Sequence, residues 1–179
     1  GISLKDSELA PVPVRREVVS PIYGVDPRGV ALQEVVRLVA ESSREVAAVS
    51  SKVLFNVVNG STGLVRQLFV SSQGSVLDLS HAMSEGFVMV VARGQHGNLD
   101  LYDFTGHQRG FEVLTEGYRS QHIDLPSLRD FALDMARTTV EVADSPPLPS
   151  SEGEVVVVTD THFNALVCHE VMGHPSELD

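Results

Sequence analysis

Residues 48–115 constrain the fold of this chain more than any other part of it. Five segments in this range are rich in β-branched and aromatic residues, and short runs of turn-forming residues separate them: "NGSTG", "SQG", "SEG" and "RGQHGN". Strands joined by such short breaks usually pair as antiparallel hairpins. The pattern therefore predicts an antiparallel sheet of about five strands, over residues 50–58, 62–72, 74–82, 84–93 and 98–106.

Helical periodicity is present on both sides of this β-rich region. Apolar residues recur at helical spacing over residues 28–46 and again over residues 126–142. Asp26, which is followed by a proline, is the expected N-cap of the first helix, and Ser127 or Asp124 is that of the second. We expect both helices to pack on the sheet, which places the chain in the α+β class.

The two ends of the chain differ in composition from its centre. Four prolines near the N-terminus predict an extended lead-in. Near the C-terminus a Pro/Ser-rich linker precedes an apolar run over residues 154–160, which predicts a buried strand, and a helix capped by Asp160 or Thr161 should follow it. The expected regions are a lead-in, a central α+β domain and a C-terminal strand and helix, over residues 1–28, 29–145 and 146–179.

The charge and the cysteine content exclude several classes of partner. The 179-residue chain carries a net charge of −11 and only two lysines, which repels phosphate backbones and argues against nucleic-acid binding. No apolar run approaches the roughly 20 residues of a membrane helix, so no membrane partner is expected. A single cysteine, Cys168, rules out internal disulfides and predicts a reducing, cytoplasmic location.

The C-terminal helix carries the motif His169-Glu170-Val-Met-Gly-His174. In zinc hydrolases imidazoles bind the ion, and a neighbouring glutamate accepts the proton of a water molecule. Histidines five residues apart diverge by about 140° on a regular α-helix and cannot share an ion there. One wide turn with i→i+5 hydrogen bonds brings them together, and Gly173 and Pro175 favour such an irregularity. We therefore expect a regular helix up to the motif and a widened or broken one between Glu170 and His174.

Plainer explanations exist for each of these residues. Two histidines and a glutamate can fall within six residues by chance, with His174 capping the helix C-terminus and His169 in the core. Cys168 is expected to be a small buried residue rather than a ligand. Glu177 can accept a hydrogen bond from a ligand histidine, but a solvated charge is the simpler expectation, because the turn after Gly173 should fray. The other five histidines are expected to be solvated or structural.

Longer stretches of the chain resemble the TldD/PmbA family of metallopeptidases. "GEVVVVTDTHFNALVCHEVMGHPSELD" is similar to its His-Glu-x-x-x-His segment, and "APVPVRREVVSPIYGVDPRGVALQEVVRLV" and "DFTGHQRGFEVL" look like its middle region. The resemblance implies that His169 and His174 bind zinc and that Glu170 is the general base. Family members are much longer, and a downstream β-rich domain supplies a cysteine as the third zinc ligand. The resemblance thus implies that this chain is a central fragment that binds zinc weakly or not at all.

On this resemblance, the chain is expected to be part of a zinc-dependent peptidase that hydrolyses short or unstructured peptides. Family members assemble as homo- or heterodimers, so the expected partner is another family member, and the fragment alone is expected to be inactive. The alternative is a non-catalytic partner or scaffold subunit of such a dimer, because some family members lack the metal motif. A purely structural zinc site is disfavoured, since one cysteine cannot build a closed four-ligand cage.

Overall fold

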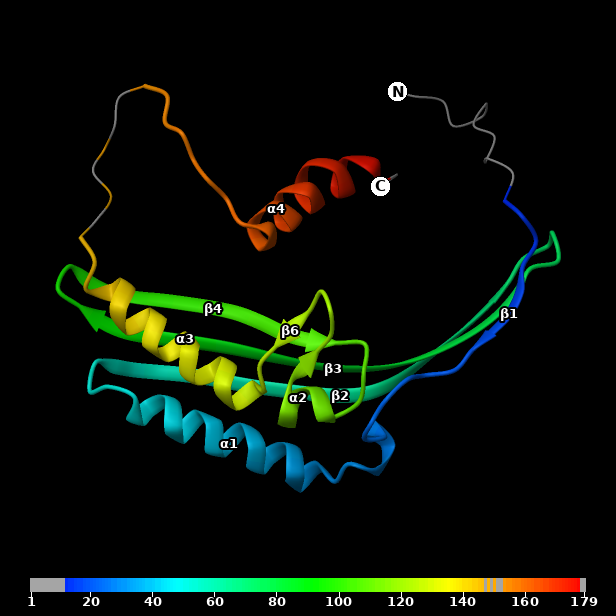
Figure 1. Cartoon of the computed structure of the whole chain (residues 1–179), viewed down its shortest axis with the longest axis horizontal. Coiled ribbons are helices and arrows are strands. Elements are labelled where there is room, and N and C mark those ends of the chain that lie inside the picture. The colour runs from blue at the N-terminus through cyan, green and yellow to red at the C-terminus, as the bar shows by residue number, and fades with distance from the viewer. Residues whose placement is uncertain (1–11, 147, 149, 151–152, 178–179) are drawn as a thin grey trace. The chain divides into compact units, whose positions relative to one another are not determined.

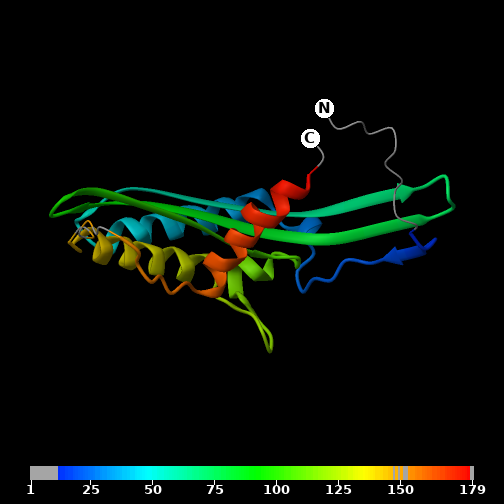
Figure 2. The same cartoon turned by 90° about the horizontal axis from the view of Figure 1, so that it is seen from above.

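The computed structural model describes residues 12–146, 148, 150 and 153–177, and the chain divides into two compact units, Gly1–Pro146 and Pro147–Asp179. In the first unit helices pack on one face of a β-sheet, which confirms the predicted α+β class (Figure 1, Figure 2). Its elements are β1 (Arg16–Val19), the 3-10 turn η2 (Pro27–Gly29), α1 (Leu32–Ala48), β2 (Val53–Val70), β3 (Val76–Gly94), β4 (Gly97–His107), α2 (Glu112–Glu116), β5 (Tyr118–Arg119), β6 (Asp124–Leu125) and α3 (Leu128–Ala143).

Three long strands take the place of the five expected ones. β2 pairs antiparallel with β3 along almost its whole length, and β4 pairs antiparallel with the C-terminal part of β3. β1 lies within the expected lead-in and pairs in parallel with the first residues of β3. β1, β2 and β4 therefore all pair with β3 in the four-stranded sheet. Of the four predicted breaks, only "SQG" and "RGQHGN" are turns.

The other two predicted breaks, "NGSTG" and "SEG", lie inside strands and opposite each other. Gly60 of β2 pairs with Gly86 of β3 in the middle of the ladder. A Cβ atom added to Gly86 would lie 2.5 Å from the Leu128 side chain, and one added to Gly60 would lie 3.3 Å from that of Val39. The prediction of turns was wrong here, because these glycines allow α1 and α3 to approach the sheet closely.

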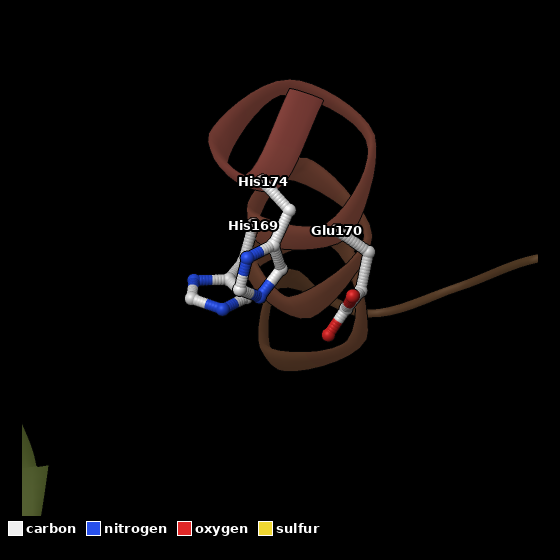
Figure 3. A group of neighbouring side chains, drawn as sticks. All are labelled: His169, Glu170 and His174. Carbon is white, nitrogen blue, oxygen red and sulfur yellow. The ribbon is translucent and has the colours of Figure 1, made fainter. Parts of the chain in front are cut away.

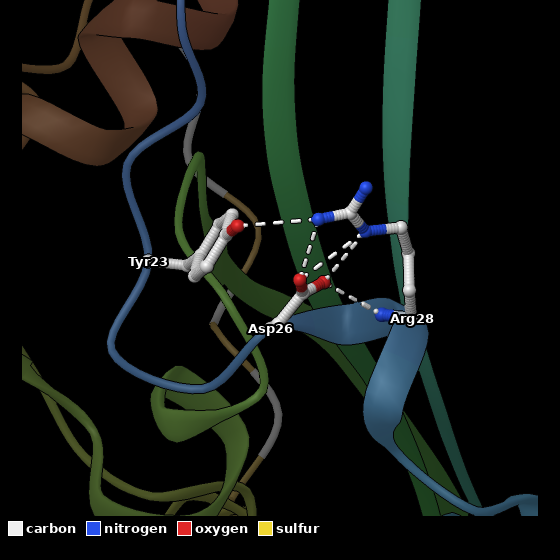
Figure 4. Close-up of polar contacts among 3 residues, drawn as sticks. All are labelled: Tyr23, Asp26 and Arg28. Atoms are coloured by element: carbon white, nitrogen blue, oxygen red, sulfur yellow. Dashed lines mark hydrogen bonds and ion pairs between the residues drawn. The ribbon is translucent and has the colours of Figure 1, made fainter.

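The first helix begins later than predicted. Asp26 caps the short turn η2 instead of α1, and its carboxylate accepts a hydrogen bond from the backbone N–H of Arg28 at 3.0 Å. The Arg28 guanidinium also donates to both Asp26 oxygens and to the Tyr23 hydroxyl (Figure 4). The hydrogen bonds from Arg28 hold the pKa of the Asp26 carboxyl well below its usual range. Since the two residues after η2 have extended backbone, α1 starts only at Leu32.

The second helix and the core agree with the sequence pattern. The Ser127 side chain caps α3 by accepting a hydrogen bond from the backbone N–H of Asp130 at 3.2 Å, and the helix covers nearly the predicted range. The core lies between the helices and the sheet, and its fully buried residues come from both layers: Val46, Val88, Val90, Leu114, Leu128, Ala132 and Ala136.

Glu112, the first residue of α2, joins two segments that are distant in sequence. Its carboxylate accepts backbone N–H hydrogen bonds from Gly24 at 2.8 Å, Val25 at 2.7 Å and Gly110 at 3.1 Å. Burial raises the pKa of Glu112, but the backbone hydrogen bonds together outweigh burial, so its pKa lies below the ordinary value. The ionised carboxylate therefore joins the segment that precedes η2 to the start of α2.

Glu112→Gln is expected to lower the free energy of unfolding near neutral pH by about 1–2 kcal/mol, because a charged acceptor is lost at a partly exposed position. Since the folded-state pKa is lowered, this stabilisation is complete above the ordinary value of 4.5 and is lost as the pH falls through the folded-state pKa. Urea unfolding should show a difference between parent and variant that shrinks on acidification. Glu116→Gln, at an exposed position of α2, should match the parent throughout. A pH-independent difference for Glu112→Gln would contradict the charge argument.

The second unit contains an unpaired apolar segment followed by a helix. Residues 154–160 form no strand in the structure, and Val156 and Val158 are 96% and 93% exposed, so the predicted buried strand is wrong for this chain. A strand is stabilised by pairing, and the described part of this unit offers no partner strand. The helix comprises α4 (Thr161–Cys168), the π-helical turn η3 (His169–Gly173) and the 3-10 turn η4 (His174–Ser176). None of the helices in the described ranges is long and apolar enough to span a membrane.

Candidate metal centre

The helix of the second unit changes its geometry at the His-Glu-His motif. Asp160 caps α4 by accepting a hydrogen bond from the backbone N–H of Phe163 at 2.8 Å, and α4 is regular as far as Cys168. In the π-helical turn that follows, the backbone N–H of His174 donates to the carbonyl of His169. This i→i−5 hydrogen bond widens the helix, which confirms the predicted irregularity.

The wide turn brings the two imidazole rings together. The ring centroids of His169 and His174 are 4.6 Å apart and the ring planes meet at 86° (Figure 3). One candidate ligand atom from each of His169, Glu170 and His174 lies within 4.8 Å of the other two, and all three residues are exposed. In the part of the chain that the structure describes, this is the one group of His, Cys and carboxylate side chains with the spacing of a metal site.

The donor set of this cluster fits a divalent metal ion. Imidazole nitrogens and carboxylate oxygens bind zinc at about 2.0–2.2 Å, so two ligands of one tetrahedral ion lie roughly 3.4 Å apart. The separations of up to 4.8 Å in the cluster can close to this value through small side-chain rotations, for which exposed residues have room. The cluster is therefore a candidate metal centre in which the two imidazoles can bind an ion and the Glu170 carboxylate lies beside them.

The turn after Gly173 is helical, whereas the sequence predicted that it would fray. The Ser176 hydroxyl donates to the carbonyl of Met172 at 2.7 Å, and the backbone N–H of Glu177 donates to the carbonyl of His174 at 3.1 Å. The Glu177 carboxylate also lies 3.0 Å from Nδ1 of His174, so it is not simply a solvated charge. The three-residue spacing of His174 and Glu177 could have predicted this contact, because side chains i and i+3 are neighbours on a helix.

The remaining residues considered in the sequence take no part in the cluster. Cys168 is exposed, so the prediction that it is buried was wrong; α4 contains no buried residue. His107 packs its ring 4.4 Å from that of Tyr118, which agrees with a structural role. His81 is half-buried in β3. The other three histidines are exposed: His96, His122 and His162.

Comparison with known proteins finds similarity to a metalloprotease. No protein-family model matches the chain. The chain is 29% identical over 173 residues to the metalloprotease slr0863 of Synechocystis sp. (strain ATCC 27184 / PCC 6803 / Kazusa), and the alignment covers 96% of this chain and 34% of that protein. The chain thus spans about a third of the length of this relative.

Proposed function

We propose that this chain is the motif-bearing part of a longer, zinc-dependent peptidase of the TldD/PmbA type. The observation that carries the proposal is the π-helical turn, which brings His169 and His174 together beside Glu170. Single π-helical turns are rare and occur frequently at functional sites. The similarity to a metalloprotease of greater length supports the same chemistry.

In this proposal His169 and His174 hold the zinc ion and Glu170 is the general base. Bound zinc polarises the scissile carbonyl and lowers the pKa of water. The Glu170 carboxylate accepts the proton of the attacking water and then donates it to the leaving nitrogen as the peptide bond breaks. One carboxylate oxygen of Glu170 lies within 4.8 Å of a nitrogen of each imidazole, which supports a place for Glu170 beside water bound to the ion.

The proposal includes a cellular location, a substrate class and a partner. A single cysteine supports a reducing, cytoplasmic compartment, and the net charge of −11 argues against nucleic acid as a ligand. The TldD/PmbA resemblance supports short or unstructured peptides as substrates and a homo- or heterodimer as the assembly. We therefore propose a cytoplasmic, dimeric peptidase.

Removing zinc from the longer protein is expected to slow peptide hydrolysis about 100-fold or more, because the metal supplies several kcal/mol of transition-state stabilisation. The measurement is cleavage of an unstructured peptide, followed by mass spectrometry before and after chelation. Zinc should restore the rate and magnesium should not, since imidazole is a poor ligand for magnesium. His174→Ala should stay slow even with added zinc, whereas His96→Ala, at an exposed position, should match the parent. A parental rate after complete removal of bound metal would contradict the proposal.

A further inference from the structure

A carboxylate holds one of the two candidate imidazole ligands but not the other. Nδ1 of His174 lies 3.0 Å from Oε2 of Glu177. The His169 ring contacts the His174 ring, but within the described residues its nitrogens have no hydrogen-bond partner. The two rings are therefore oriented by different interactions.

The backbone of η4 places the Glu177 side chain beside His174. The backbone N–H of Glu177 donates to the carbonyl of His174 at 3.1 Å and closes the 3-10 turn. Side chains three residues apart on such a turn lie nearly above one another. The carboxylate thus reaches the imidazole through local geometry, without a contribution from any other element.

This contact selects one form of the His174 ring. An ionised carboxylate can only accept hydrogen bonds, so Nδ1 of His174 is the donor. A neutral imidazole carries a single N–H, which leaves the lone pair on Nε2. We propose that Glu177 is a positioning residue that holds His174 in the Nδ1–H tautomer and presents Nε2 to the metal. The inference rests on the metal-ligand role proposed for His174, and carboxylate partners of this kind make an imidazole a stronger ligand.

The tautomer of His174 tests this role directly in the metal-free 179-residue chain. We expect ¹⁵N spectra of the imidazoles near pH 8.5, where histidine is neutral, to show His174 protonated on Nδ1. Glu177→Ala should move the proton to Nε2, the main form in free histidine. Glu177→Gln should keep it on Nδ1, because the amide oxygen still accepts. Glu154→Gln removes one exposed charge of the same unit and should change nothing, and His169 is an internal reference. An Nε2–H tautomer in the parent would overturn the inference.

Zinc titration of the same four proteins separates positioning from direct ligation. The parent should bind zinc weakly, because two imidazoles without a third strong ligand leave the ion largely hydrated. Glu177→Ala should weaken this binding about 10–100-fold, and Glu177→Gln should retain most of the affinity. Equal losses in both variants would overturn the inference, since they would make Glu177 a direct ligand. If millimolar zinc shifted the signals of other histidines but not those of His169 or His174, the proposed metal site itself would be contradicted, an outcome distinct from the tautomer result.

Discussion

Replacing Glu170 with glutamine in the longer protein is expected to lower kcat for peptide hydrolysis about 10²–10⁴-fold while zinc stays bound. Glutamine has nearly the shape of glutamate, so the π-helical turn over His169–Gly173 should persist. Its amide cannot accept the proton of the attacking water, and the leaving nitrogen then lacks its proton donor. Steady-state kinetics and the metal content of the same samples measure the two halves of this expectation.

The control for Glu170→Gln is Glu154→Gln, which removes an equal charge from an exposed position of the same unit. It should keep both the zinc and the parental rate. A Glu170→Gln protein that cleaves peptides at nearly the parental rate would show that Glu170 is not the base. A variant that loses its zinc would show instead that the carboxylate is a metal ligand.

Leu128→Ala is expected to lower the free energy of unfolding of the first unit by about 2–5 kcal/mol. Leu128 is fully buried, and its methyl groups lie over the glycine pair of the sheet: Cβ atoms added to Gly86 and Gly60 would be 2.5 Å and 3.4 Å from them. Because glycine has no side chain that could move into the vacated space, truncation should leave a cavity between α3 and the sheet. Urea unfolding near neutral pH measures the change.

The matched control is Leu32→Ala, since Leu32 is the first residue of α1 as Leu128 is of α3, but is 71% exposed. This substitution should change the free energy of unfolding by no more than about 0.5 kcal/mol. If Leu128→Ala destabilised the protein no more than Leu32→Ala, the close packing of α3 against the glycine pair would be refuted.

Features that depend on neighbours in sequence could be predicted. The Ser127 and Asp160 caps each bond a backbone N–H three residues away, and both were among the expected N-caps. The widened helix at His169–Gly173 follows from local chemistry as well, because glycine and a following proline both weaken regular helical bonding there. Short-range geometry of this kind is specified by the residues themselves.

Features that depend on distant partners could not be predicted. The glycines at positions 60 and 86 have the composition of turns, and only the helices packed over them show that they belong to continuous strands. The apolar run over residues 154–160 has the composition of a strand, yet it forms none without a paired neighbour.

The sequence by itself determined the candidate metal centre of this protein, because His169, Glu170 and His174 lie within six residues and one helical turn can bring them together. Only the tertiary structure decided which apolar segments became strands and where they began and ended. The physical reason is that strand pairing and close helix–sheet packing join residues far apart in the chain, whereas caps and helical turns join neighbours.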